Sequence, residues 1–177
     1  MPGLGGRTIG KLGATAVLMG GPDILTSLAS GAIDAAEWIC PVADLGLGMH
    51  QAAKFYYGPG WHEPSTLLDL SIDLKEWEGL DADTQALMME MAKAFNVDVF
   101  SRFQALNGPA LGKLLNEHGV QLKTFPDELL IALGNAAGEV MEERGSIDSQ
   151  TKAICNHILS FRKNIMDWST TVSYTHL

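Results

Sequence analysis

The chain has 177 residues and a mass of 19.0 kDa, with 46% hydrophobic and 19% charged residues. This composition predicts a folded domain with a buried core and excludes an intrinsically disordered chain. The formal charge of -9 argues against nucleic acid or an anionic membrane surface as a partner, because both require a basic face. No apolar, uncharged stretch is long enough for a bilayer, so we expect no membrane-spanning helix.

The first third of the chain is rich in glycine, with 12 of the 19 glycines in residues 1–60. Short apolar runs between glycines predict short strands and tight turns there. The expected elements are a strand over 14–19, a helix from Pro22 to Gly31, a strand over 33–39, a helix over 45–53, an extended segment over 54–57 and a turn at 58–60. Strand, helix and strand within residues 14–39 would form a βαβ-like unit, which indicates parallel pairing in an α/β sheet.

The remainder is mostly helical in pattern. We expect a strand over 67–72, a surface turn around Trp77, a helix from Asp81 that breaks at Gly108-Pro109, a further helix to about His118, a strand over 120–125, and helices over 126–144 and 146–168. The methionines Met88, Met89 and Met91 are interpreted as core residues of the first of these helices.

Most standard motifs are absent. The glycine-rich start has neither a dinucleotide fingerprint nor a phosphate loop, and the five histidines are scattered, which argues against a zinc site. Cys40 and Cys155 both lie among apolar residues and are best interpreted as plain buried thiols, although they could pair in an exported protein.

Two short segments each place a tryptophan beside a carboxylate: Glu37-Trp38 in residues 33–38, and Trp61-His62-Glu63 after a Gly-Pro-Gly turn. If both lie where parallel strands end, two carboxylates and nearby backbone oxygens would suit a hard cation, Na⁺ or Ca²⁺, that bridges to an anionic ligand. The tryptophans would then form an apolar wall. The competing interpretation, surface carboxylates and ordinary core tryptophans, is favoured by spacing alone.

These same residues resemble the solute-binding proteins of tripartite ATP-independent periplasmic (TRAP) transporters, a DctP-like family, and within it the branch that binds 2-oxo acids and other monocarboxylates. The resemblance rests on Gly31 to Trp38, the Tyr56-Tyr57 pair, Pro59 to Glu63, the preceding GLGGRTIGKLGAT with its Gly-Gly-Pro-Asp turn, and Ser160-Phe-Arg162. It covers essentially residues 3–170.

The resemblance implies the second lobe of a two-lobed periplasmic binding protein of the type II-like α/β class, with a parallel-rich sheet, flanking helices and long C-terminal helices. It implies no catalysis, a periplasmic location and delivery of a small organic acid to the membrane permease of a TRAP transporter. The implied metal site holds Na⁺ or Ca²⁺ through the Glu63 carboxylate and the Trp38 backbone oxygen, with Glu37 beside them. Trp38, Trp61 and Glu63 would contact the ligand. Some members of the family form dimers through exchanged helices, so a homodimer through the C-terminal helices is also expected.

The chain departs from the family in its extent. Family members are about twice as long, with a signal peptide and a first lobe, and their ligand-clamping arginine lies upstream of the point at which this chain begins. Arg7 does not occupy that place. We therefore expect a C-terminal fragment that binds ligand weakly or not at all on its own.

We expect an α/β lobe over 1–125, C-terminal helices over 126–171, and a truncated or foreign tail over 172–177. Two alternatives to a receptor lobe stay open. One is a small enzyme that uses Glu37 and Glu63 as an acid/base pair, although no nucleophile or cofactor loop accompanies them. The other is a helical dimerisation module.

Overall fold

A computed structural model describes residues 3–62 and 69–174, with side chains described through Ser169. The chain forms two compact units, which we describe separately: residues up to Leu18 group with those from Pro126 onward, and Met19–Phe125 form the other. Neither unit contains, within these described ranges, a helix that is long and apolar enough for a membrane span. The expected boundaries at residues 126 and 172 stay predictions.

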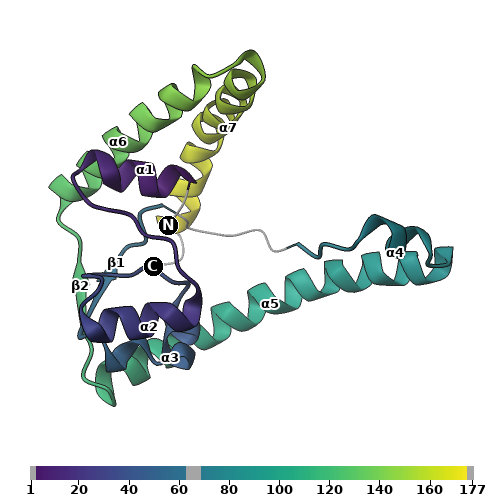
Figure 1. The fold of residues 1–177 in the computed structure, drawn as a ribbon. Helices are drawn as coiled ribbons and strands as arrows, with labels where there is room; N and C mark the ends of the chain where they lie inside the picture. Colours follow the sequence, from purple (N-terminus) through teal and green to yellow (C-terminus); the bar gives the residue numbers. More distant parts are fainter. Residues whose placement is uncertain (1–2, 63–68, 175–177) are drawn as a thin grey trace. The chain divides into compact units, whose positions relative to one another are not determined.

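The unit Met19–Phe125 is built around a pair of parallel strands, β1 (Phe55–Gly58) and β2 (Gln121–Thr124) (Figure 1). Phe55 pairs with Gln121 and Gly58 with Thr124. The helices of this unit are α2 (Gly21–Ser30), α3 (Pro41–Leu47), the short 3₁₀ helix η1 (Met49–Gln51), α4 (Leu74–Glu78) and α5 (Ala82–Asn116). The expected α/β class with parallel pairing is confirmed, since a parallel pair is flanked by helices.

The strand predictions for the glycine-rich part are mostly wrong. Residues 14–19 and 33–39 form no strand, and the sheet of the described residues contains only β1 and β2. A segment becomes a strand only where a neighbouring strand accepts its backbone hydrogen bonds, and within the part of the chain that the structure describes neither segment pairs with a strand. Their side chains are correspondingly open, with Leu18 68% and Ile39 60% exposed. Of the strand expected over 67–72, residues 69–72 are irregular, and 67 and 68 lie outside the described residues.

The helix from Pro22 to Gly31 is confirmed as α2, which ends at Gly31 in the left-handed conformation that glycine adopts without strain, with a φ of 74°. The expected helix over 45–53 instead begins at Pro41 and is interrupted at Gly48, whose φ is 80°. The surface turn expected around Trp77 is in fact the short helix α4. It begins because the Asp73 carboxylate accepts hydrogen bonds from the backbone N–H groups of Lys75 and Glu76.

Helix α5 passes through Gly108 and Pro109 without interruption, so the predicted break is wrong. A proline inside a helix costs roughly 3 kcal/mol. Packing of the C-terminal part of α5 against α3 offsets this cost: Ala110 and Leu114 are almost fully buried. In addition, Asn107 Oδ1 accepts a hydrogen bond from the Val42 backbone N–H at 3.1 Å. The predicted core role of the methionines is also wrong for Met89 and Met91, which are 54% and 61% exposed.

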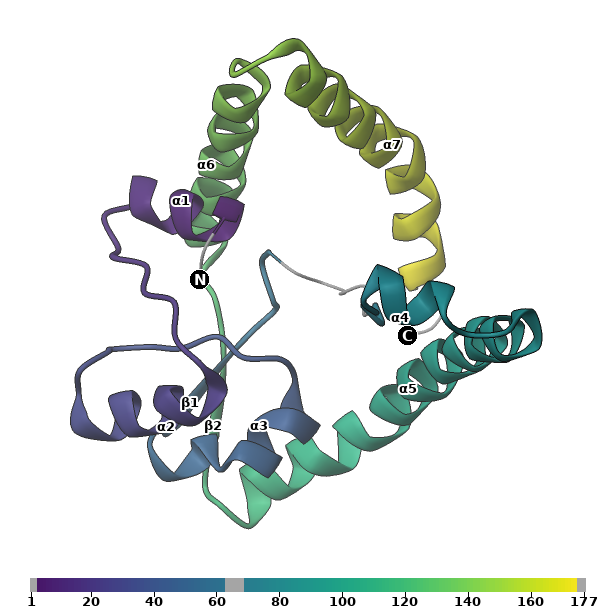
Figure 2. The ribbon, with the colours of Figure 1, turned by 45° about the vertical axis from the view of Figure 1, so that its right-hand side comes forward.

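The other unit contains α1 (Gly3–Lys11), α6 (Asp127–Gly145) and α7 (Ser149–Tyr174) (Figure 2). Helix α1 was not expected, because its glycines favour turns. It packs against α6, and Lys11 Nζ forms ion pairs with Glu139 at 2.9 Å and Glu143 at 2.7 Å. The predicted helices over 126–144 and 146–168 are confirmed as α6 and α7. Val140 and Leu133 of α6 and Cys155 of α7 form a small core.

Candidate functional site

The two tryptophan–carboxylate segments approach each other in the structure. Glu37 Oε2 lies 3.7 Å from His62 Nε2, although the two residues are 25 positions apart in the chain. The side chain of His62 is 10% exposed and that of Glu37 is 45% exposed. A buried imidazole therefore lies behind a carboxylate that still reaches solvent. The Glu37 segment is irregular rather than the end of a strand, whereas His62 follows the carboxyl end of β1.

Both predicted tryptophans are half-buried, and each is next in the chain to one member of this pair. The ring of Trp61 packs on that of His62, with centroids 4.5 Å apart and a tilt of 38°. The Trp38 ring lies against Gly21 at the start of α2, where even a methyl group would not fit. The two aromatic residues are thus held by different neighbours, one by His62 and the other by the backbone of α2.

Glu63, expected to be both a metal ligand and a ligand contact, lies outside the described residues. Among the described residues no group of three or more His, Cys, Asp and Glu side chains could hold a metal ion. The described donors that match the expectation are the Glu37 carboxylate and the Trp38 backbone oxygen. Both are hard oxygen donors, the type that Na⁺ and Ca²⁺ prefer, and they fit such a cation as part of a larger set. Neither ring nitrogen of His62 has a hydrogen-bond partner among the described residues.

A buried carboxylate is hydrogen-bonded to the residue that follows Trp38. Asp44 of α3 is 7% exposed, accepts a hydrogen bond from the Tyr56 hydroxyl at 2.5 Å, and accepts a longer one from the Ile39 backbone N–H at 3.5 Å. Burial raises the pKa of Asp44, while these two hydrogen bonds act in the opposite direction. Burial and the neighbouring Asp44 also raise the pKa of Tyr56 well above its usual value. The pair is a hydrogen-bonded polar contact inside an apolar setting.

A small cavity of about 20 Å³ is lined by Asp44, Tyr56, Leu114 and His50, among others. His50 stacks on His118, with ring centroids 3.9 Å apart and an angle of 28° between the planes. Burial, and then the charge of His118, lower the pKa of His50. Its Nδ1 is buried with no hydrogen-bond partner among the described residues.

The other unit has a cleft of about 440 Å³ between α1, α6 and α7, lined in part by Arg7, Arg144 and Cys155. Arg7 is an exposed residue of α1 at its edge. Cys155 is buried, Cys40 is half-buried, and both are free thiols.

Sequence reasoning missed the residues that support the candidate site. Asp44 lies in the apolar run PVADLGL, and nothing in its spacing relates it to Tyr56 or Ile39. The sequence around Gly21, Gly-Gly-Pro-Asp, predicts only a turn before a helix. A proline-started helix that carries an aspartate in an otherwise apolar run was the one available signal for a buried acid.

The sequence profile of the bacterial extracellular solute-binding proteins, family 7 (DctP), matches residues 2–146. Over 169 residues the chain is 36% identical to a monocarboxylate 2-oxoacid-binding periplasmic protein of Nostoc sp. (strain PCC 7120), and this match covers 96% of the chain and 46% of that relative.

Three solved structures are similar over essentially the whole chain and 54% of their own length. A TRAP periplasmic solute binding protein from Colwellia psychrerythraea with bound calcium and pyruvate has a TM-score of 0.90 and 31% identity. One from Pseudoalteromonas atlantica with bound sodium and pyruvate has a TM-score of 0.91 and 30% identity. One from Bordetella bronchiseptica, a mixed occupancy dimer with copurified calcium and picolinate, has a TM-score of 0.87 and 30% identity. The chain spans about half the length of these relatives.

Proposed function

Because the chain belongs to the DctP family of bacterial extracellular solute-binding proteins, we propose that it forms one side of the binding site of a TRAP receptor for a small organic acid. Proteins of this family are receptors rather than enzymes, and the family therefore argues against Glu37 and Glu63 as a catalytic acid/base pair. The 2-oxo acids and related monocarboxylates are the favoured ligand class, since the similar proteins include a 2-oxoacid-binding protein and structures with pyruvate or picolinate.

The observation that carries this proposal is the approach of Glu37 to His62, which brings together the two segments that contain Trp38 and Trp61, with the Trp61 ring on His62. A half-exposed carboxylate next to indole rings suits a small ligand with a charged end and an apolar end. A carboxylate ligand alone would be repelled by Glu37, and a cation between them removes that repulsion.

We therefore assign the cation to Glu37, the Trp38 backbone oxygen and Glu63, with Trp38, Trp61 and Glu63 also contacting the ligand. Na⁺ or Ca²⁺ suits these oxygen donors, and similar structures contain one or the other. When bound, the cation supplies the positive charge that attracts the ligand carboxylate. Trp38 and Trp61 exclude water from that charge pair, which strengthens it. His62 packs against Trp61, and its Nε2 atom lies 3.7 Å from the Glu37 carboxylate.

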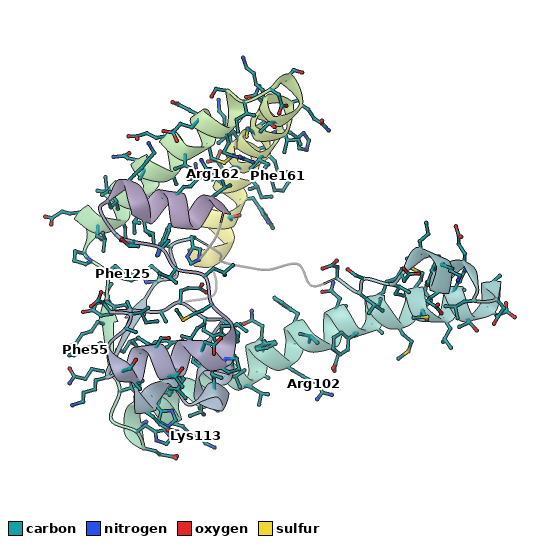
Figure 3. All side chains as sticks on the ribbon, viewed as in Figure 1. Phe55, Arg102, Lys113, Phe125, Phe161 and Arg162 are labelled. Carbon is teal, nitrogen blue, oxygen red and sulfur yellow. The ribbon has the colours of Figure 1, made fainter. Side chains whose placement is uncertain are left out.

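The remaining parts of the proposal concern partners and location. The receptor would act in the periplasm and deliver its ligand to the membrane subunits of the transporter, as is expected for the family. A homodimer through the C-terminal helices is supported only by the exposed apolar residues of α7, among them Phe161, which is 62% exposed and lies next to Arg162 (Figure 3). A helical dimerisation module without a ligand is the less economical alternative, because it leaves Glu37 and both tryptophans unused.

A chimeric receptor tests the proposed function. Residues 3–170 would replace the matching part of the Colwellia psychrerythraea protein, whose remaining part supplies the other side of the site. We expect calorimetry to detect cation-dependent binding of pyruvate or a related 2-oxo acid by the chimera. The 177-residue chain alone should bind these acids weakly or not at all. A folded chimera that binds no carboxylate with either Ca²⁺ or Na⁺ would contradict the proposal.

A further inference from the structure

We infer that Asp44 and Tyr56 are positioning residues that fix the direction of the Trp38 carbonyl oxygen. The inference rests on the proposed function in one respect, because it takes that oxygen as a cation ligand. Neither Asp44 nor Tyr56 needs to touch the ligand or the cation. They would act on the cation site through the orientation of the Trp38–Ile39 peptide group.

The first step concerns the geometry of the Trp38–Ile39 peptide. This peptide is trans, so its C=O and N–H bonds lie in one plane and point in opposite directions. The Ile39 N–H points to Asp44 Oδ1, at an N···O distance of 3.5 Å. The Trp38 carbonyl oxygen must therefore point away from Asp44 and from α3. Rotation of this peptide would break the hydrogen bond and redirect the oxygen at the same time.

The second step is that Asp44 is a fixed acceptor. Its carboxylate is buried, and its other oxygen accepts the short hydrogen bond from the Tyr56 hydroxyl of β1. Helix α3, which carries Asp44, is fixed to α5 because the Val42 N–H at the start of α3 donates a hydrogen bond to Asn107 Oδ1. Two elements other than the Trp38 segment thus determine where the acceptor lies. A hydrogen bond to a charged group is also stronger than one between neutral groups.

The third step is that the Trp38 side chain is held from another direction. The edge of its six-membered ring lies against Gly21 at the start of α2. A side chain fixed by α2 and an adjacent N–H fixed by α3 leave little freedom for the carbonyl between them. This matters because residues 33–39 form no strand, and their backbone pairs with no strand of the described residues.

Outer residues that orient metal ligands typically change metal affinity by about 10- to 100-fold when they are removed. The substitutions Asp44→Ala, Asp44→Asn and Tyr56→Phe are made in the 177-residue chain for hydrogen exchange and in the chimeric receptor for cation binding. Asparagine keeps a side-chain oxygen for the Ile39 N–H, and its NH₂ group can donate to the Tyr56 oxygen. Tyr57→Phe is the matched control, because Tyr57 is half-exposed and keeps its ring stack on Phe125 without its hydroxyl.

The first readout is amide hydrogen exchange at Ile39, which needs no cation. We expect exchange at Ile39 to become roughly fivefold to tenfold faster in Asp44→Ala, to change less in Tyr56→Phe, and to stay near wild type in Asp44→Asn and Tyr57→Phe. The second readout is Tb³⁺ luminescence of the chimeric receptor, excited through tryptophan, since Trp38 and Trp61 belong to the two segments of the proposed site and Tb³⁺ replaces Ca²⁺. Affinity for Tb³⁺ should fall about 10- to 100-fold in Asp44→Ala and recover in Asp44→Asn.

Unchanged Ile39 exchange in Asp44→Ala would overturn the inference, as would unchanged Tb³⁺ affinity in a variant whose Ile39 amide has lost its protection. A purely structural role would lower stability in Asp44→Asn and Asp44→Ala alike without a selective change at Ile39. If the chimeric receptor without these substitutions gives no Tb³⁺ signal, the cation part of the proposed function fails. The hydrogen-exchange comparison then decides the positioning role by itself.

Discussion

The indole ring of Trp38 lies directly against the backbone of Gly21, where a methyl group would come within 2.8 Å of the ring atom Cη2. Real side chains do not approach so closely, so only glycine fits at this position while Trp38 keeps its place. The first residue of α2 and the irregular segment before α3 are thereby coupled. A substitution in either segment should therefore change the position of Trp38 in the candidate site.

Gly21→Ala should displace the Trp38 ring and lower stability, even though alanine is the better helix former. The contact is made by the six-membered part of a rigid indole, which moves only if the whole side chain rotates. We expect a changed tryptophan fluorescence spectrum together with a lower midpoint in urea unfolding. In the chimeric receptor described above, the same substitution should weaken ligand binding.

Gly46→Ala is the matched control. Gly46 lies inside α3 with no atom near the position of an added methyl group, and its backbone is helical. There the substitution should raise the free energy of unfolding by roughly 0.5–1 kcal/mol, because alanine loses less backbone entropy than glycine. Equal and favourable effects at Gly21 and Gly46 would show that Trp38 is not held as the structure indicates.

The packing of α5 on α3 predicts a large effect at Leu114. This side chain is 2% exposed and borders the small cavity beside Asp44 and Tyr56. Leu114→Ala should lower the free energy of unfolding by about 2–5 kcal/mol, through lost burial and an enlarged cavity. Leu106→Ala on the same helix, where the side chain is 50% exposed, should change it by less than about 0.5 kcal/mol. Denaturant titrations followed by circular dichroism measure both, and similar losses would contradict the assignment of the core.

The stacked histidines predict a dependence of stability on acid. Because the pKa of His50 is lowered in the fold, the unfolded chain binds more protons between that lowered value and the ordinary value near 6.5. The free energy of unfolding should therefore fall as the pH falls through this range, and the contribution is complete above it. His50→Phe keeps a ring on His118 and should weaken this dependence in melting curves recorded between about pH 5 and 7.5.

Much of the second half of the fold followed from local pattern. Helices α6 and α7 and strand β2 are bounded by Pro126, by the turn after Gly145 and by Gly119, and local chemistry of this kind can be recognised without a structure. The failures have a common physical origin. Whether residues 14–19 become a strand, or whether Pro109 breaks a helix, depends on partners that are distant in sequence.

The candidate site shows the same limit. Glu37, Trp38 and Trp61 could be singled out because an aromatic residue beside a carboxylate is unusual in local sequence. Asp44 and Gly21 could not, because their roles consist of a hydrogen bond to a backbone group and a contact with a ring. The exposure of Met91, Phe95 and Phe100 on α5 could not be predicted either. Their helical spacing indicates core positions, but each of the three is more than 60% exposed.

Asn107 offers a test of why α5 continues through its proline. Asn107 precedes Gly108 and Pro109 in the chain. Its side-chain oxygen accepts a hydrogen bond from the Val42 backbone N–H at the start of α3. Asn107→Leu removes the acceptor and leaves this N–H without its partner, so we expect a loss of about 1–2 kcal/mol in the free energy of unfolding. Asn107→Asp keeps an acceptor and should lose less. If both variants unfold at the wild-type urea concentration, the bond between α3 and α5 does not help to offset the cost of Pro109, and burial of Ala110 and Leu114 must do so alone.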